Sequence, residues 1–503
     1  MAKQKTVSVS VQYKDIEVVK DELLVLGVFE TETLPKDLAG LDKKAGGNIK
    51  KVYSLKDFAG EAKQSVIIYN NNDKFPGRIM LMGLGKREDF ELDILRVAAA
   101  TAIRKADNLK ITSITICFDS PKGTSLEAKA QAMAEGLEIG RYSYTEQISS
   151  PKGIGGIIKA TILAWEQSEL ALMRKGAKIG IVQGHGQNFS RYLANKGGGE
   201  ISPATLAAEA RKMARKTGMK CKVFDEKELA SLGMGGILAV GQGSVNKPRL
   251  IMLEYNGKKS VKTPDLVLVG KAITFDSGGV SLKPGLGMQD MKFDKSGGCN
   301  VLGIMQAVAE LKLAKNVVAL IPSAENMPDG NSYRPGDIIK TYSGKTVEIQ
   351  NTDAEGRMIL CDALHYAVKH LKPKAIIDMA TLTGACIVAL GLHKAGVFAN
   401  NDEIVTDLKA ASALAGEPVW QLPCDQPYRE QLKSECADMR NIGGKEGGSA
   451  TAAAFLREFV GEDTPWAHID IAGVSDLKSP TDSMASGGTG YIVRTILEFL
   501  KNS

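Results

Sequence analysis

Two groups of charged residues in the second half of the chain could carry out chemistry together. The first group consists of two lysines and two aspartates: Lys271, Asp276, Lys283 and Asp294. The second is the heptapeptide at residues 351–357 (NTDAEGR), which contains Asp353 and Glu355. Four carboxylates in one pocket would repel each other or lose their hydration without a compensating charge. Divalent metal ions supply that charge, so the pattern indicates an oxygen-rich metal site.

The residue types also indicate what such a site would do. Oxygen ligands suit Mg²⁺ and Mn²⁺, and Zn²⁺ also accepts carboxylates. A lysine can ligate a metal only as the neutral amine, which requires its pKa to be lowered by burial and by neighbouring cations. Two ions about 3.5–4 Å apart can activate water and polarise a carbonyl, which is hydrolysis chemistry. Each residue alone is more often a cap, a turn residue or a surface charge, so the prediction depends on their joint placement.

These side chains must be held by the ends of buried strands. Continuous apolar runs predict central parallel strands at residues 265–270 (DLVLVG), 316–321 (NVVALI) and 374–379 (KAIIDM). Helical periodicity is found at residues 300–311 and 357–371, and Pro373 ends the second helix. Open α/β sheets bind ligands at the carboxyl ends of their strands, where the first charged group begins.

The second charged group is expected just before a helix. Asp353 and Glu355 are two residues apart, so in an extended stretch their side chains point to the same side. Negative charge is also favoured near a helix N-terminus.

The first part of the chain alternates strand-like and helix-like segments. Short apolar or β-branched runs predict strands at residues 6–11, 22–28, 65–69, 78–84 and 113–118, and helical spacing is found at residues 91–105 and 126–141. A chain of 503 residues is too long for one hydrophobic core. We therefore predict an α/β fold with a smaller N-terminal α/β domain (residues 1–165, structural or assembly role), a connecting helix (166–195) and a larger catalytic domain (196–503). The catalytic domain is expected to have a mixed, mainly parallel central sheet flanked by helices.

Composition limits the classes of function. The net charge of +6 comes without a basic block, which disfavours nucleic-acid binding. Seven cysteines without a CxxC pair indicate reduced thiols in the cytoplasm. The N-terminus has no apolar core of a signal peptide, and no stretch approaches 18 uncharged apolar residues, so we expect no membrane span.

Taken together, the motifs resemble those of the leucyl aminopeptidase (cytosol aminopeptidase) family. The family signature is NTDAEGR followed by leucine, and here Met358 follows it. The resemblance covers the whole second domain, with GKAITFDSGGVSLKP, MKFDKSGG, SAENMPDG, YRPGD, DMATLTGA, GGSATAAAFL and HIDIAG in one order. Two positions depart from it: Ala272 stands where many members have glycine, and Ser475 stands where some relatives have methionine in the side-chain pocket.

The resemblance implies roles for individual residues. A tightly held metal would be bound by Lys271, Asp276, Asp294 and Glu355, and a more exchangeable one by Asp276, Asp353 and Glu355. Lys283 would polarise the substrate carbonyl and stabilise the oxyanion, and Arg357 would hold a bicarbonate ion as the general base. The pocket for the N-terminal side chain would be lined by Met291, Thr381, Gly384 and Ala472. The free α-amino group of the substrate would bind the exchangeable metal, which explains exopeptidase action.

The implied function is metal-dependent removal of N-terminal residues from peptides, leucine or other apolar residues among them. The cofactors would be two divalent ions per subunit, Mn²⁺, Zn²⁺ or Mg²⁺, with bicarbonate. The relatives form homohexamers, as dimers of trimers, and a cytoplasmic location is expected. Two alternatives remain: a two-metal phosphoesterase, and an additional DNA-binding or regulatory role of the hexamer, which only the mild positive charge supports. The sequence leaves open the native metal pair and the preferred N-terminal residue.

Overall fold

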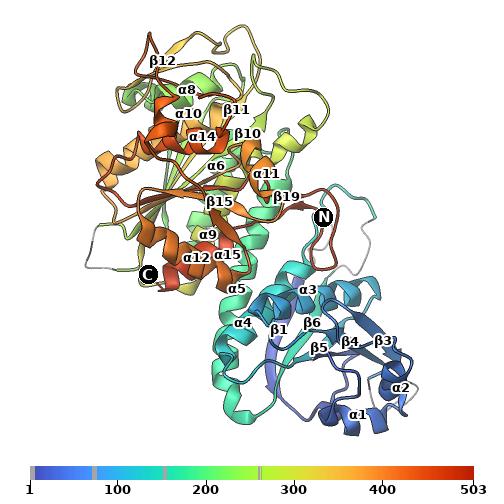
Figure 1. The fold of residues 1–503 in the computed structure, drawn as a ribbon. Coiled ribbons are helices and arrows are strands. Elements are labelled where there is room, and N and C mark those ends of the chain that lie inside the picture. Colours follow the sequence, from blue (N-terminus) through green and yellow to red (C-terminus); the bar gives the residue numbers. More distant parts are fainter. Residues whose placement is uncertain (1–5, 71–75, 151–155, 259–260, 262, 503) are drawn as a thin grey trace. The chain divides into compact units, whose positions relative to one another are not determined.

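The computed structural model describes residues 6–70, 76–150, 156–258, 261 and 263–502. The chain forms two compact units, the first made of residues 1–188 and 478–486, and the second of residues 189–477 and 487–503. Both are drawn in Figure 1, and the division between them falls within the long helix α5 (Leu170–Asn195), after Asn188. Within the described ranges no helix has both the length and the apolar character that crossing a membrane requires.

The first unit is built on a six-stranded sheet in the order β1-β6-β5-β2-β4-β3. All neighbouring strands are parallel except β3 and β4. The strands are β1 (Thr6–Tyr13), β2 (Leu23–Val28), β3 (Ser65–Tyr69), β4 (Arg78–Gly83), β5 (Ser113–Phe118) and β6 (Ile157–Ala164). The predicted α/β domain with a largely parallel sheet is confirmed, and β6 is an addition to the five predicted strands.

Helices α3 (Leu92–Asn108) and α4 (Leu126–Arg141) pack against each other in the first unit, and both were predicted from their apolar spacing. Two short helices, α1 (Ala39–Lys44) and α2 (Asn48–Ser54), were not predicted. Each has at most seven residues and carries two lysines, so their formation depends on packing more than on a sequence pattern.

The second unit is built on a nine-stranded mixed sheet in the order β16-β15-β18-β14-β9-β11-β8-β7, with β10 beside β11. The pairs that include β14, β9 and β10 are parallel, whereas β15–β18, β11–β8 and β8–β7 are antiparallel. The strands are β7 (Lys220–Phe224), β8 (Arg249–Asn256), β9 (Leu266–Gly270), β10 (Ala272–Asp276), β11 (Asn316–Asn326), β14 (Ile376–Ala380), β15 (Ala395–Ala399), β16 (Val419–Gln421) and β18 (Trp466–Asp470). The predicted mixed, mainly parallel sheet is confirmed.

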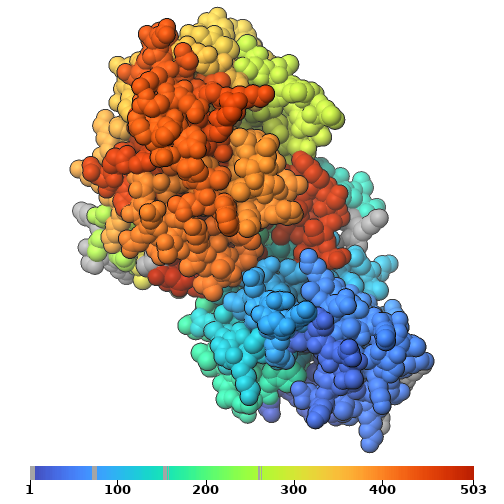
Figure 2. All heavy atoms as spheres, viewed as in Figure 1, coloured from blue at the N-terminus to red at the C-terminus, as the bar shows by residue number. Residues whose placement is uncertain are grey.

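Helices cover both faces of this sheet (Figure 1). One face carries α8 (Gly235–Gly241), α10 (Glu355–Tyr366) and α14 (Gly448–Arg457), and the other carries α9 (Ser296–Leu311), α12 (Asp402–Ala415) and α15 (Val493–Asn502). Figure 2 shows the same view with every heavy atom, in which side chains fill the spaces between the ribbons. Because helices lie on both faces, β9, β11 and β14 are buried at every residue, as their continuous apolar runs predicted.

The strand register determines which loops meet at the edge of the sheet. Gly270 at the end of β9 pairs with Met379 of β14, and Ala380 of β14 pairs with Asp470 of β18. Since the three strands are parallel, the residues that follow them emerge side by side. Lys271 and Thr381, which come after β9 and β14, therefore lie at one edge.

The structure corrects two expectations about local conformation. No strand was predicted directly after residue 270, but residues 272–276 form β10, because they pair with the end of β11 across a register shift. Glu355 was expected in an extended stretch but is the first residue of α10, since Ala354 (φ −102°, ψ 41°) has already left the extended region. The helix predicted to end before Pro373 does so through one π-helical segment, Ala367–Leu371.

Candidate metal centre

Lys271 lies at the junction of β9 and β10 and is only 3 % exposed. Its Nζ is 2.8 Å from Asp294 Oδ1, 2.8 Å from Glu355 Oε1 and 2.8 Å from the carbonyl oxygen of Thr381. Asp294 comes from the 3-10 helix η4 (Met288–Lys295), and Glu355 begins α10. One buried ammonium thus connects three segments that are far apart in sequence.

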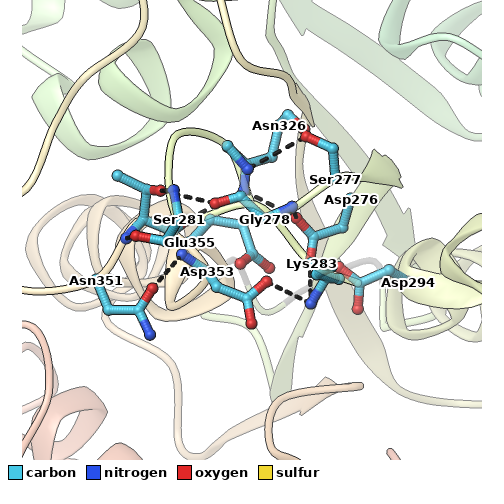
Figure 3. Close-up of polar contacts among 12 residues, drawn as sticks. Asp276, Ser277, Gly278, Ser281, Lys283, Asp294, Asn326, Asn351, Asp353 and Glu355 are labelled. Carbon is cyan, nitrogen blue, oxygen red and sulfur yellow. Dashed lines mark hydrogen bonds and ion pairs between the residues drawn. The ribbon is translucent and has the colours of Figure 1, made fainter. Parts of the chain in front are cut away.

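Lys283 makes the corresponding contacts on the more open side of the cluster (Figure 3). Its Nζ is 2.9 Å from Asp276 Oδ2 and also pairs with Asp353. Asp276 is buried at the end of β10, whereas the side chain of Asp353 is 34 % exposed. The two lysines therefore divide the four carboxylates into two pairs, and only Asp353 in the pair at Lys283 is partly exposed.

The carboxylates are crowded and only partly neutralised. Oxygen atoms of Asp276, Asp353 and Glu355 lie within 4.8 Å of one another. Asp294 Oδ2 and Glu355 Oε2 are buried and accept no hydrogen bond from the described part of the chain. Four carboxylates face two ammonium groups, and burial raises the pKa of Asp276, of Asp353 and, most strongly, of Asp294. These oxygen donors and the uncompensated charge fit divalent cations.

The pKa values of both lysines follow from the same surroundings. Burial lowers the pKa of Lys271, but the charges of Asp294 and Glu355 outweigh it and raise the pKa above its ordinary value. For Lys283 the carboxylate of Asp276 likewise outweighs burial, and its pKa is raised. Burial therefore does not by itself produce the neutral amine that a lysine ligand needs. The expected role of Lys271 as a metal ligand depends on bound cations that lower its pKa.

The heptapeptide 351–357 is held to the loop after β10 by its own hydrogen bonds. The Thr352 hydroxyl donates to the Gly278 carbonyl (2.7 Å) and accepts from the Ser281 N–H (2.8 Å). Asn351 Oδ1 accepts from the backbone N–H of Asp353 at 2.8 Å. These bonds fix the backbone up to the N–H of Asp353, which helps to keep its carboxylate beside Lys283 although it is partly exposed.

Arg357 is buried on α10, two residues after Glu355. Its Nη1 donates to the Asn441 carbonyl at 2.7 Å, and its Nε has no hydrogen-bond partner in the described part of the chain. Burial lowers its pKa to about 10, so the guanidinium remains charged at neutral pH. A buried cation with a free N–H is suited to hold an anion.

The four residues expected to line a side-chain pocket are placed as follows. Thr381 touches the cluster directly, because its hydroxyl donates to Asp294 Oδ1 at 2.7 Å. Ala472 follows β18, the neighbour of β14, and Gly384 begins α11 (Gly384–Leu390). Met291 is half-buried in η4, the segment that also carries Asp294.

Three residues at the centre were not assigned a role from the sequence: Asn326, Asn441 and Asp470. Asn326 donates to Asp276, and the backbone of Asn441 anchors Arg357. Asp470 accepts from the Leu382 N–H (3.1 Å) and the Thr383 hydroxyl (2.7 Å), which fixes the loop after Thr381. The available signal for Asn326 and Asp470 was their position at the end of an apolar strand run.

Comparison with known proteins matches most of both units to one protein family. The model of the cytosol aminopeptidase family catalytic domain matches residues 188–497, and that of the family's N-terminal domain matches residues 25–150. A probable cytosol aminopeptidase of Roseiflexus castenholzii is 45 % identical over 484 residues, which is 96 % of each chain. One of Burkholderia pseudomallei is 41 % identical over 485 residues, covering 96 % of this chain and 95 % of the relative.

Solved structures give the same result. A variant of tomato leucine aminopeptidase matches with a TM-score of 0.90 and 31 % identity, over 100 % of this chain and 98 % of the other. The bottromycin maturation enzyme BotP in complex with Mn matches with a TM-score of 0.85 and 30 % identity, over 96 % and 99 %. The phosphoesterase alternative therefore falls away: the chain belongs to the cytosol aminopeptidase family and is a hydrolase that acts on N-terminal peptide bonds.

Proposed function

We propose that the protein is a metal-dependent aminopeptidase whose reaction takes place at the cluster of Lys271, Lys283 and the four carboxylates. The observation that carries the proposal is the set of carboxylate oxygens of Asp276, Asp353 and Glu355 within 4.8 Å of one another. Such crowding costs folding free energy, and proteins retain it at sites where a bound cation or a reaction uses it.

In this proposal one divalent ion would be held by Lys271, Asp276, Asp294 and Glu355, and a second by Asp276, Asp353 and Glu355. When bound, the ions supply Lewis acidity that activates water and polarises the scissile carbonyl. Asp294 Oδ2 and Glu355 Oε2 have no hydrogen-bond partner among the described residues, and they support this assignment because a cation would give each buried atom a partner. Mn²⁺ is the ion we propose first, since the similar BotP structure is a complex with Mn.

Two cationic side chains have separate roles in this proposal. Lys283 is charged, partly exposed and fixed between two carboxylates, so it can stabilise negative charge that develops on the carbonyl oxygen. Arg357 would hold a bicarbonate ion, which would supply a general base when bound. Its buried Nε, without a partner in the described chain, supports an anion at this position.

Substrate preference is assigned to the surroundings of the Thr381 loop. Met291, Thr381, Gly384 and Ala472 offer an apolar or small surface, which favours leucine and other apolar N-terminal residues. Ser475 is buried, and its hydroxyl lies 3.5 Å from the Ala472 carbonyl. Serine is smaller than the methionine that some relatives have at this position. The pocket for the N-terminal side chain of the substrate should therefore be wider than in those relatives.

We also propose that the protein works in the cytoplasm as a homohexamer, a dimer of trimers. The resemblance of the motifs supports the assembly, and the names of the relatives, which are cytosol aminopeptidases, support the location. Sedimentation velocity of the purified protein tests the assembly.

Removal of the metal tests the proposed function directly. Dialysis against a chelator is expected to lower hydrolysis of leucyl-p-nitroanilide by about a hundredfold or more, because the remaining residues cannot activate water alone. Reloading with Mn²⁺ should restore activity, and the far-UV circular dichroism should stay unchanged throughout. Full activity of protein shown by elemental analysis to be metal-free would contradict the proposal.

Gly356 offers a second test, because a methyl group there would collide with Lys271. A Cβ built on Gly356 would lie 2.6–2.8 Å from Cδ, Cε and Nζ of Lys271. Gly356→Ala favours the helix by up to about 1 kcal/mol, yet it must displace a buried, ion-paired ammonium. We expect kcat/KM to fall about a hundredfold, while the melting temperature changes little.

Gly330→Ala is the matched control for that variant. A Cβ at exposed Gly330 meets no atom within 4 Å, so kcat/KM should equal that of the wild type. Equal activity of the Gly356→Ala protein and this control would show that the position of Lys271 does not matter for the reaction.

A further inference from the structure

Asn326 is a buried amide at the point where three segments of the centre meet. It is the last residue of β11, is 1 % exposed, and lies opposite Asp276 of β10 after the register shift. Its carbonyl accepts hydrogen bonds from the backbone N–H (3.0 Å) and the hydroxyl (2.7 Å) of Ser277. Its Nδ2 donates to Asp276 Oδ1 (2.8 Å) and to the Thr352 carbonyl (3.1 Å). Figure 3 shows Asn326 above the carboxylates of Asp276, Asp353 and Glu355.

The orientation of this amide is determined by its neighbours. The Thr352 carbonyl oxygen can only accept a hydrogen bond, and Asp276 Oδ1 likewise only accepts when its carboxylate is ionised, as it is when it binds a cation. A flipped amide would place its own oxygen against both of them, which is repulsive. The other end of the amide faces Gly279 (φ +68°), where a Cβ would lie 2.7 Å from Asn326 Oδ1.

Because the amide of Asn326 is uncharged, it can orient the Asp276 carboxylate without neutralising it. Its Oδ1 is held by two uncharged donors, the amide of Asn326 and the Gly278 N–H at 2.9 Å. These bonds orient the carboxylate and keep its negative charge, so Oδ2 faces the side of Lys283. A lysine or arginine in place of Asn326 would orient the carboxylate too, but would neutralise part of the charge that attracts a cation.

We propose that Asn326 is a positioning residue of the metal centre, which sets the separation between Asp276 and the segment that carries Asp353 and Glu355. The proposal rests on the proposed function, in which these carboxylates bind divalent ions. Loss of the Asn326 amide should then weaken the binding of metal ions more than it weakens the binding of substrate. Groups that orient ligands in this way typically change metal affinity or activity about 10- to 100-fold.

The test is a titration of metal-free full-length protein with Mn²⁺, followed by the electron paramagnetic resonance signal of the free ion. Asn326→Ala should weaken Mn²⁺ binding about 10- to 100-fold, whereas KM at saturating Mn²⁺ should change little. Asn326→Asp distinguishes the effect of the segment positions on Mn²⁺ affinity from the effect of an added negative charge. An added negative charge alone would tighten binding, but a carboxylate facing two acceptors pushes the segments apart and should weaken it.

Asn400→Ala is the matched control, because Asn400 also joins two segments of this unit through its amide, which donates to the carbonyls of Gly461 and Thr464. This variant should melt at a lower temperature and bind Mn²⁺ like the wild type. Wild-type or tighter Mn²⁺ binding by Asn326→Asp, or by folded Asn326→Ala, overturns the positioning role. If Glu355→Gln also binds Mn²⁺ like the wild type, the metal assignment itself fails, so the two failures are distinguishable.

Discussion

Replacing Glu355 with glutamine is expected to lower kcat/KM for a leucyl substrate by about 10³-fold or more, a loss of about 4 kcal/mol in transition-state stabilisation. Glutamine keeps the size of the side chain, and its Oε1 can still accept the hydrogen bond from Lys271. It loses the negative charge, and it places an amide NH₂ where Oε2 now lies without a partner in the described chain. Because Glu355 is a proposed ligand of both ions, Mn²⁺ binding should weaken together with activity.

The stability of the same variant distinguishes a site residue from an ordinary buried acid. The charge of Glu355 contributes, after burial, to the raised pKa of Asp276, so the two carboxylates repel each other. Removing one of them should leave the melting temperature of the metal-free protein unchanged or higher. Calorimetry of metal-free wild type and variant measures this difference.

Glu417→Gln is the control, since Glu417 is also 1 % exposed in the second unit but accepts hydrogen bonds from the N–H and hydroxyl of Thr495. That variant should lose stability and keep kcat/KM. Near wild-type activity of Glu355→Gln with Mn²⁺ would remove Glu355 from the reaction.

The sheets and long helices were predictable because their burial leaves a periodic pattern. Strand β9 is covered on both faces and has a continuous apolar run, and α4 has apolar residues at helical spacing. β10 (Ala272–Asp276) was missed because it is short, is followed by Ser277-Gly278-Gly279, and is defined by pairing with β11. Pairing of that kind is tertiary information, which local sequence does not carry.

The charged residues of the centre were predictable for a different reason. Four carboxylates and two lysines at strand ends are costly to bury, so their joint placement indicates function. Asn326 is neutral, and a neutral amide near a strand end is ordinary in any protein. Only the register shift that sets Asn326 opposite Asp276 reveals its contact.

The conformation around Glu355 shows a second limit. The spacing of Asp353 and Glu355 correctly indicated that their carboxylates converge. The predicted extended backbone conformation was wrong, because Glu355 already belongs to α10. A helix start after Ala354 brings the two side chains together as well as an extended strand would. Convergence of side chains is therefore more predictable than the φ and ψ angles that produce it.

Replacing Lys283 with methionine should lower kcat about 10²- to 10³-fold, the usual loss when one fixed donor to a developing oxyanion is removed. Methionine keeps most of the length of the aliphatic chain and removes the charge. The raised pKa of Lys283 keeps the ammonium protonated at neutral and moderately alkaline pH, so deprotonation of this group should not limit wild-type activity there. Lys345→Met removes a lysine that pairs with Glu458 (2.7 Å), away from the centre, and should leave kcat unchanged.

Metal binding then separates the role of Lys283 from that of Glu355. The Lys283 ammonium competes with any cation for Asp276 and Asp353, because it pairs with both carboxylates. Its removal should leave Mn²⁺ affinity equal to or higher than that of the wild type, whereas Glu355→Gln should lower it. A Lys283→Met protein that loses Mn²⁺ and activity together would show that this lysine organises the carboxylates. A protein that keeps Mn²⁺ and loses kcat alone places the charge of Lys283 on the reacting carbonyl.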